Sequence, residues 1–328
     1  MTRVAIVGAG IAGIACASRL RDAGIGVTLF DKARGVGGRL ATRRVKTKRG
    51  EIAFDQGATH FTARSAEFRA LVEGWERDEL VARWSAAGED GWVGTPSINT
   101  PLKAMARDLD VRLSCPVTAL TRGPAGWTLH SEAQRLGEFD IAVIAIPAEQ
   151  AAPLLSLHDF EMARAAMSVR SYPCWSAMFA FAEPLRGLSD FVRGSGPLAC
   201  AVRDSAKPGR TPGERWVVQG SWDWSEAHLT HESGSICALL LAELGRLAEY
   251  ELPHPLHASA HRWLFAQPSG QDRRLLWNAD IGLGACGDWL SHGFAEFAWQ
   301  TGHALGEAIM LSRMSDDAPR PTVIADVP

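Results

Sequence analysis

Three glycines near the N-terminus have the type and spacing needed to bind the phosphates of a dinucleotide. Gly8, Gly10 and Gly13 form a G-x-G-x-x-G pattern directly after an apolar run, and Asp31 follows roughly 20 residues later. Gly8 suits a tight turn, Gly10 lets the backbone approach a pyrophosphate, and Gly13 lets a helix pack closely on a strand. Asp31 can accept a hydrogen bond from a ribose hydroxyl. The pattern predicts a dinucleotide-binding βαβ unit.

The helix that this motif opens adds backbone donors to the same site. Ile11 and Ala12 are its first residues, so their N–H groups have no partner within the helix and can bind phosphate. The positive end of the helix dipole favours the same charge. An ordinary glycine-rich turn is the alternative, and the context of strand, turn and helix disfavours it.

A second glycine-rich segment follows Asp31 and helps to distinguish an FAD-binding chain from an NAD-binding one. The backbone at Gly37 and Gly38 can touch a pyrophosphate again, and Arg34 or Arg39 can offset its charge. Domains that bind only NAD do not usually carry such a segment, so it favours FAD. We count Lys32, Arg34, Gly38 and Arg39 among the cofactor contacts.

The Gly-Gly-Arg element at 37–39 resembles that of the flavin amine oxidase superfamily. The resemblance implies that a segment of pattern D-x-G-A passes beside the flavin ring, and here the segment supplies Gln56, Gly57 and Ala58. A separate segment, Val117 in a predicted strand over 117–121, is also counted as a cofactor contact.

The C-terminal part of the chain matches the second flavin motif of that superfamily. Gly287 and Asp288 end a predicted strand, and the resemblance implies that Asp288 bonds the ribityl chain or the pyrophosphate. Glu296 follows as a further cofactor contact. The N-terminus of the last helix, near 299–302, is expected to point at the N1–C2=O edge of the flavin and to stabilise its reduced form.

Four segments narrow the resemblance to bacterial renalases, namely 31–64, 222–225, 260–266 and 286–289. Those enzymes use FAD to oxidise misreduced 2- and 6-dihydro-NAD(P) to NAD(P)+, and O2 becomes H2O2. The resemblance implies this activity for the chain. One difference concerns the pocket, because this chain has His60 where bacterial renalases commonly carry Tyr. Another is a longer basic insertion at 46–49.

The catalytic candidates are His60, Trp224, His261 and Trp299. Oxidation of a dihydropyridine needs no general base, because hydride leaves a ring carbon and no proton is lost. The protein must then only position that carbon. His261 is expected to bond the nicotinamide carboxamide, and Trp299 to flank the ring. The alternative for each is a packing role, since single His and Trp side chains commonly serve in cores.

Two other functions stay open at this point. One is oxidation of an amine or another small molecule by the same fold, and the other is a flavin- or nucleotide-binding module without activity. The substantial middle part of the chain disfavours the module. The turn Ser291-His292-Gly293-Phe294 has no Cys, so we expect FAD to be bound non-covalently. The basic run at 32–49 is either a solvated hairpin or an attractor for the phosphates of a dinucleotide substrate.

The elements that must position these residues indicate an α/β fold of two lobes. A Rossmann-type FAD-binding domain is expected over 1–64, 95–152 and 270–313, with strands at 4–7, 27–30 and 141–146 and helices at 11–23 and 297–311. A mixed-sheet substrate domain is expected over 65–94 and 153–269, with strands at 177–181 and 216–222 and a helix at 235–247. The tail at 314–328 is polar and is expected to be flexible.

The charge, the apolar content and the cysteines of the chain indicate which classes of binding partner to expect. The chain has 328 residues with a formal net charge of -3, which indicates neither nucleic acid nor an anionic membrane. It contains no run of 18 apolar residues, so no membrane span is expected. Six scattered cysteines without metal spacing predict free thiols, no metal site and a reducing cytoplasm. A small dinucleotide or amine substrate and O2 are the expected partners, and no obligate protein partner is predicted.

Overall fold

The computed structural model describes residues 2–48, 50–132, 134–314 and 323–326. The chain divides into two compact units. The first unit comprises Met1–Gly38, Leu102–Ser171 and Pro268–Pro328, and the second comprises Arg39–Pro101 and Tyr172–Gln267. The sequence-based division instead assigns 39–64 and 95–101 to the first lobe and 153–171 to the second.

The described residues of the first unit form a seven-stranded sheet. Its strand order is β20 (Val323–Asp326), β18 (Arg273–Asn278), β19 (Leu283–Ala285), β12 (Ile141–Ile144), β1 (Arg3–Val7), β2 (Gly26–Phe30) and β8 (Asp110–Arg112). The five strands from β19 to β8 are parallel to one another. Strand β18 runs antiparallel to both of its neighbours, β19 and β20. Residues 4–7 of β1 and the whole of β12 are continuous apolar runs, as expected for strands that are buried on both faces.

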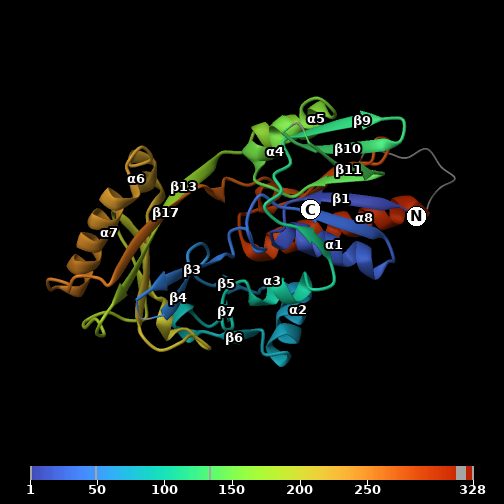
Figure 1. Cartoon of the computed structure of the whole chain (residues 1–328). Coiled ribbons are helices and arrows are strands. Elements are labelled where there is room, and N and C mark those ends of the chain that lie inside the picture. Colours follow the sequence, from blue (N-terminus) through green and yellow to red (C-terminus); the bar gives the residue numbers. More distant parts are fainter. Residues whose placement is uncertain (1, 49, 133, 315–322, 327–328) are drawn as a thin grey trace. The chain divides into compact units, whose positions relative to one another are not determined.

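Helices cover this sheet and connect its strands. Helix α1 (Ile11–Asp22) links β1 to β2, and α8 (Ala295–Met314) packs along α1 (Figure 1). A three-stranded sheet of β9 (Ala119–Gly123), β10 (Gly126–Ser131) and β11 (Gln134–Phe139) precedes β12. Helices α4 (Ala148–Leu155) and α5 (Phe160–Met167) follow β12 and share its hydrophobic core, which is why 153–171 belong to the first unit.

The end of the chain corrects one expectation. The sequence predicts a flexible tail over 314–328, but Val323–Asp326 pairs with β18 as an antiparallel strand. Residues 315–322 and 327–328 lie outside the described residues. The polar, proline-bearing composition conceals this strand, because an edge strand needs backbone pairing on one side only.

The second unit is built on a five-stranded sheet. The strand order is β14 (Phe191–Arg193), β15 (Leu198–Arg203), β16 (Glu214–Gly220), β13 (Ser171–Phe181) and β17 (His257–Pro268). One face packs against α7 (Ser233–Ala248) through the cluster that includes Ala177, Phe179 and Val218. We call this the α7 face. Trp222 is not part of the strand predicted over 216–222, because β16 ends at Gly220 and α6 (Trp222–Ala227) begins there.

The opposite face of that sheet is covered by a hairpin, so we call it the hairpin face. Strands β3 (Thr42–Thr47) and β4 (Gly50–Asp55) form the hairpin, and Val45, Ile52 and Phe54 pack on Met178 and Val217. This packing explains why 39–64 belong to the second unit. A sheet of three short strands also belongs to this unit: β5 (Phe61–Thr62), β7 (Gly91–Gly94) and β6 (Val81–Arg83). The unit also contains 3-10 turns at Ser85–Ala87 and Asp204–Ala206. Helix α2 is Ala66–Arg77, and α3 is Thr100–Met105.

No described helix has the length and apolar character that crossing a membrane would need. Within the described residues, no group of three or more His, Cys, Asp or Glu side chains is arranged to hold a metal ion.

Candidate functional site

Two of the N-terminal glycines are required by the protein itself. Gly8 has a φ of +112°, and a Cβ there would lie 2.3 Å from the carbonyl oxygen of Ala145. A Cβ at Gly13 would lie 2.0 Å from the carbonyl oxygen of Gly8. Real atoms do not approach so closely, so only glycine lets β1 turn and α1 pack against the turn. The tight turn and the close packing predicted for this motif are both present.

Gly10 is different, because no protein atom demands a glycine there. Its backbone, with φ of -79° and ψ of 179°, is extended and open to any residue. A Cβ at Gly10 would meet no atom within 4 Å. The residue caps α1, and as a glycine it has no side chain that could bond the free N–H groups of that helix start. Open space before unbonded donors is what a bound pyrophosphate requires, so the turn fits a dinucleotide.

The carboxylate of Asp31 joins this turn to the segment after β2. One of its oxygens accepts from the N–H of Ala9 and the other from the N–H of Ala33, each at 2.7 Å. The N–H of Gly37 donates to the carbonyl of Ala9 at 2.9 Å, and Gly37 pairs with Gly10 as an isolated bridge. The second glycine segment therefore lies against the first. A carboxylate has about four acceptor positions, so Asp31 retains capacity for a ribose hydroxyl.

Three other predicted contacts lie around this loop. The Nζ of Lys32 donates to Gln150 at 3.1 Å, and Arg34 is exposed. The backbone before Val117 is tied to the same loop, because the N–H of Cys115 donates to the carbonyl of Asp31 at 2.8 Å. Val117 itself is half-buried. Their contact with a cofactor stays a prediction.

The Gly287–Asp288 turn lies at the same edge of the sheet as the Gly8 turn. Both turns follow the carboxyl ends of parallel strands, β19 and β1, with β12 between them. The order of the strands reverses between β1 and β12, and open α/β sheets bind ligands beside such a reversal. Asp288 is 4% exposed, and the N–H of Gly287 is held by the Oγ1 of Thr301 at 3.0 Å.

The position of the last helix corrects another expectation. Helix α8 begins at Ala295, so Glu296 lies in its first turn and 299–302 lie inside it rather than at its start. Gly302 has a packing role, because a Cβ there would lie 2.0 Å from the carbonyl oxygen of Ala12. Trp299 is 7% exposed, and its ring stacks on His303 with centroids 4.9 Å apart. This burial favours packing over contact with a substrate ring.

In the second unit, Gly57 is fixed by a close backbone contact. A Cβ there would lie 2.0 Å from the carbonyl oxygen of Arg39, and the N–H of Ala58 donates to the same oxygen at 2.8 Å. The Arg39 side chain donates to the carbonyl of Ala266 at 3.2 Å. The sequence explains this glycine by approach to a flavin, whereas the structure already explains it by approach to Arg39.

The segment at 56–58 is also held by two side chains of the five-stranded sheet. Trp263 on β17 donates its indole N–H to the carbonyl of Gln56 at 2.9 Å, and Gln219 on β16 donates to the carbonyl of Gly57 at 2.7 Å. The buried Oε1 of Gln56 has no hydrogen-bond partner among the residues that the structure describes. Sequence reasoning missed Gln219, although a polar residue at the end of an apolar strand is a usable signal.

A buried ion network lies directly before this segment and was also missed. Asp55 accepts from the Nζ of Lys207 at 3.0 Å and from Arg210 at 2.5 Å, while Lys207 also contacts Asp204 at 2.5 Å. Asp55 further accepts from the N–H of Ile98 at 3.1 Å. Burial alone would raise the pKa of Asp55, but the two cations outweigh burial and lower it. The acid of the D-x-G-A pattern is therefore a structural anchor.

His60 lies among aromatic side chains beside this network. Its ring is 5.4 Å from that of Phe191 and 6.5 Å from that of Trp84, both edge-on, and its Nδ1 is 3.1 Å from the Oγ1 of Thr59. Burial, together with the charges of Lys207 and Arg193, lowers the pKa of His60 to about 4. His60 is neutral near pH 7 and can donate or accept one hydrogen bond from each ring nitrogen.

The pKa of His60 predicts a loss of stability in mild acid. Below pH 6.5 the unfolded chain binds a proton at this residue while the folded chain does not, so stability falls as the pH drops from about 6.5 toward 4. From pH 7.5 to 5.5 this costs about 1 kcal/mol. Urea unfolding of the parent and of His60→Gln at both pH values measures this. The free energy of unfolding of His60→Gln should fall by about 1 kcal/mol less than that of the parent between pH 7.5 and pH 5.5. An equal acid sensitivity in both proteins would contradict the assignment.

His261 and Trp224, the other candidates of the second unit, lie on opposite faces of its sheet. His261 on β17 has its ring 4.5 Å from that of Trp263, on the hairpin face. Trp224 lies in α6, packs with the cluster of the α7 face, and stacks on His228 at 4.1 Å. The sheet therefore separates Trp224 from His60 and His261, and we assign Trp224 a packing role.

The buried cysteines have little nucleophilic character. Burial raises the pKa of Cys174, Cys200 and Cys286 to about 12. Each is therefore a thiol at neutral pH, and the thiolate is the reactive form.

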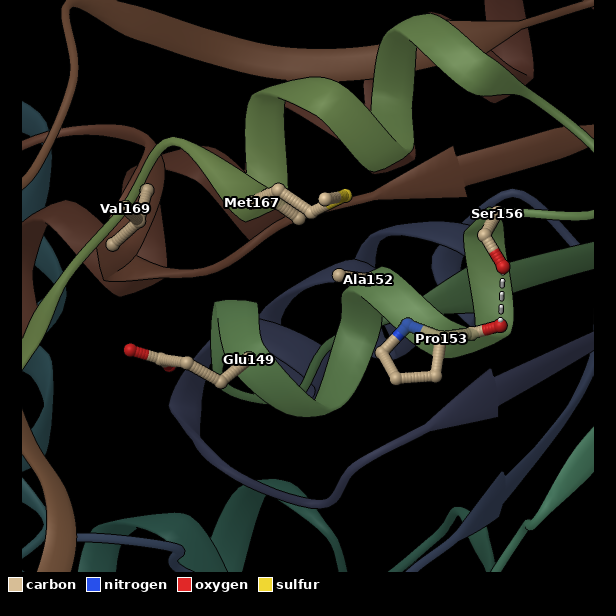
Figure 2. A pocket seen from close by; sticks show the side chains of 7 residues that line it. Glu149, Ala152, Pro153, Ser156, Met167 and Val169 are labelled. Carbon is tan, nitrogen blue, oxygen red and sulfur yellow. Dashed lines mark hydrogen bonds between the residues drawn. The ribbon is translucent and has the colours of Figure 1, made fainter.

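A surface groove between α4 and α5 of the first unit is not a candidate for chemistry. Figure 2 shows its lining side chains, among them Ala152, Pro153 and Met167. Its one titratable residue, Glu149, already accepts hydrogen bonds from the N–H and the Oγ of Ser171, at 2.7 and 3.1 Å.

Comparison with protein families agrees with the geometry of both glycine turns. Residues 6–75 match the NAD(P)-binding Rossmann-like domain. Residues 75–304 match flavin containing amine oxidoreductase, and this match covers more than half of the chain. The chain belongs to the flavin containing amine oxidoreductase family. The predicted α/β fold with a Rossmann-type domain and a mixed sheet is confirmed.

Curated relatives of this family member match over parts of their length. The bifunctional protein MnmC of tRNA 5-methylaminomethyl-2-thiouridine biosynthesis from Magnetococcus marinus is 29% identical in an alignment of 206 residues that covers 47% of this chain and 31% of that protein. Protoporphyrinogen oxidase 2 of Arabidopsis thaliana is 35% identical over 71 residues, 22% of this chain and 13% of that protein. The chain thus spans less than a third of these relatives.

Solved structures share the fold over nearly the whole chain. A candidate protoporphyrinogen oxidase from Exiguobacterium sp. 255-15 has a TM-score of 0.72 with 13% identity, covering 94% of this chain and 99% of that one. Cyclohexylamine oxidase from Brevibacterium oxydans IH-35A has a TM-score of 0.66 with 13% identity, covering 95% and 99%. At such identities the likeness concerns the fold.

Proposed function

We propose that the chain is a renalase-like oxidase that binds FAD non-covalently through its first unit. Its substrates are the misreduced 2- and 6-dihydro isomers of NAD(P), which it returns to NAD(P)+. The second unit supplies the side chains that contact the substrate. When bound, FAD accepts the hydride that the dihydropyridine ring loses on becoming a pyridinium, and O2 takes the electrons to give H2O2.

The observation that carries FAD binding is the open space beside Gly10 at the start of α1. Gly10 has an ordinary backbone and empty space beside it, so a glycine is needed there only if a ligand approaches the backbone. The N–H groups of the first turn would bind the pyrophosphate, and Asp31 the ribose. Asp288, 4% exposed at the end of β19, would bond a hydroxyl of the ribityl chain or a phosphate.

The environment of the histidines on the hairpin face supports this substrate class. Burial, and after it the charges of Lys207 and Arg193, lower the pKa of His60; burial, and after it the charge of Arg43, lower the pKa of His261. Neutral histidines near cations disfavour an ammonium group and suit a neutral dihydropyridine attached to a phosphate-bearing chain. His261 would donate to or accept from the carboxamide, and His60 would line the pocket where bacterial renalases commonly have Tyr.

A small-molecule amine oxidase is the second candidate. The two aromatic rings around His60, Trp84 and Phe191, favour it because amine pockets are typically lined by such rings. Cyclohexylamine oxidase and putrescine oxidase also share the fold. The cations near His60 disfavour an amine that binds as an ammonium ion.

Flavin reduction under anaerobic conditions tests the proposal. The holoprotein is mixed with the NADH isomers made by borohydride reduction of NAD+, and separately with cyclohexylamine and putrescine. We expect loss of the oxidised flavin absorbance with the isomers and none with the amines. Bleaching by the amines alone would overturn the proposal. Acid precipitation should release the flavin into the supernatant, whereas a covalent bond would keep it in the pellet.

A further inference from the structure

The basic hairpin β3–β4 has two distinct faces, although its sequence shows only a run of cations. Alternate residues of a strand point to opposite sides. Val45 packs on the hairpin face of the sheet, so Arg43 points to the same side. Arg44 points to the other side, where it faces Glu51 at 3.8 Å. Arg43 is thus the cation of this strand that is directed at the sheet.

The pairing of the hairpin places Arg43 near β17. Arg43 is the cross-strand partner of Phe54, and partners in an antiparallel pair have their side chains on the same side. Phe54 stacks on His257 of β17, with ring centroids 5.9 Å apart and planes 30° apart. Burial and the charge of Arg43 lower the pKa of both His257 and His261. Arg43 therefore lies on the side of the hairpin whose Phe54 contacts His257, and its charge acts on both histidines.

Arg43 lacks a counter-charge in this position. Among the described residues no carboxylate forms an ion pair with it, and its side chain is exposed. His257 has its Nε2 at 2.9 Å from the Oγ of Ser259, a second neutral donor or acceptor group. An exposed guanidinium next to neutral hydrogen-bonding groups matches a phosphate, which takes two parallel bonds from arginine.

We propose that Arg43 and His257 form an anion subsite that holds a phosphate of a dinucleotide substrate. This inference rests on the proposed function, and it explains how the protein would discriminate a dinucleotide from a smaller dihydropyridine. His261 lies four residues further along β17, roughly 13 Å for an extended strand, and keeps its expected role at the nicotinamide end. The ring reacts in the same way with or without the phosphates, so the subsite acts on binding rather than on hydride transfer.

The test measures how fast two different reductants reduce the flavin of two protein variants. One reductant is the borohydride-made mixture of NADH isomers, and the other is 1-methylnicotinamide reduced in the same way, which has no phosphate. The variants are Arg43→Gln and the matched control Arg44→Gln, on the same strand with its side chain on the other face. Anaerobic stopped-flow traces of flavin reduction give an apparent Kd and a limiting rate for each pair.

We expect Arg43→Gln to raise the Kd of the dinucleotide about tenfold or more, with an unchanged limiting rate. The Kd of the reduced 1-methylnicotinamide should not change, and Arg44→Gln should stay within about twofold of the parent for both reductants. Equal effects of the two variants on the dinucleotide, or an Arg43→Gln effect on both reductants alike, would overturn the subsite.

A direct binding measurement separates this inference from the proposed function. Calorimetric titration of the holoprotein with NAD+ needs no turnover, and Arg43→Gln should weaken this binding while Arg44→Gln does not. If neither reductant bleaches the parent protein, the proposed function fails. If the parent is bleached but NAD+ binds Arg43→Gln as tightly as the parent, only the subsite fails.

Discussion

Replacement of Gly10 by alanine should remove most of the flavin while leaving the protein folded. Its Cβ would meet no protein atom within 4 Å, and its backbone is open to any residue, so the fold should tolerate the methyl group. The methyl would occupy the space that we assign to the pyrophosphate. We expect the affinity for FAD to fall at least about tenfold. Titration of the apoprotein with FAD, followed by the quenching of flavin fluorescence, measures this change.

Two glycines of the same unit provide the comparison. Gly123 has open space beside it in the β9–β10 turn, so Gly123→Ala should bind FAD like the parent. Gly13→Ala should instead lose thermal stability even without FAD, because its Cβ would lie 2.0 Å from the carbonyl oxygen of Gly8. Unchanged FAD affinity in Gly10→Ala, or a melting temperature as low as that of Gly13→Ala, would contradict the site.

Replacement of Lys207 by methionine should destabilise the second unit strongly. The change leaves Asp204 buried without its cation and leaves Asp55 with Arg210 alone. Loss of one partner in a buried ion network costs about 3–5 kcal/mol, because the remaining charge stays desolvated. In a unit of this size we expect the melting temperature to drop by roughly 10 °C, measured by tryptophan fluorescence.

A second substitution distinguishes charge from packing. If the unpaired carboxylate causes the loss, Lys207→Met combined with Asp204→Asn should be more stable than Lys207→Met alone. Lys46→Met on the exposed side of the hairpin should change stability by less than about 0.5 kcal/mol. A double variant that is less stable than Lys207→Met would show that methionine disturbs packing instead.

Local sequence patterns predicted the Rossmann-type elements of the first unit. The apolar runs at β1, β2 and β12 and the glycine spacing all depend on neighbours in sequence, and each predicted element is present. The hairpin over the basic run also follows from local turn chemistry. The last helix was predicted over 297–311, with its N-terminus near 299–302, whereas α8 begins at Ala295. Trp299 and Gly302 lie inside the helix, where they pack on His303 and Ala12.

The predicted catalytic residues show the limit of such reasoning. His60, His261 and Trp224 are all plausible from residue type alone. Only the strand pairing reveals that Trp224 packs with the α7 face while His261 lies on the other face. The strand predicted over 216–222 ends at Gly220, and Trp224 lies in the helix Trp222–Ala227 that follows it.

What the sequence by itself determined is the family motif, the βαβ unit and the glycine that a dinucleotide needs. These depend on residues within one or two turns of each other, where spacing fixes geometry. What only the tertiary structure decided is the network of Asp55 with Lys207, the direction of Arg43 toward His257, and the strand at Val323–Asp326. These contacts join residues far apart in the chain, and their energies come from desolvation and pairing, which no local pattern records.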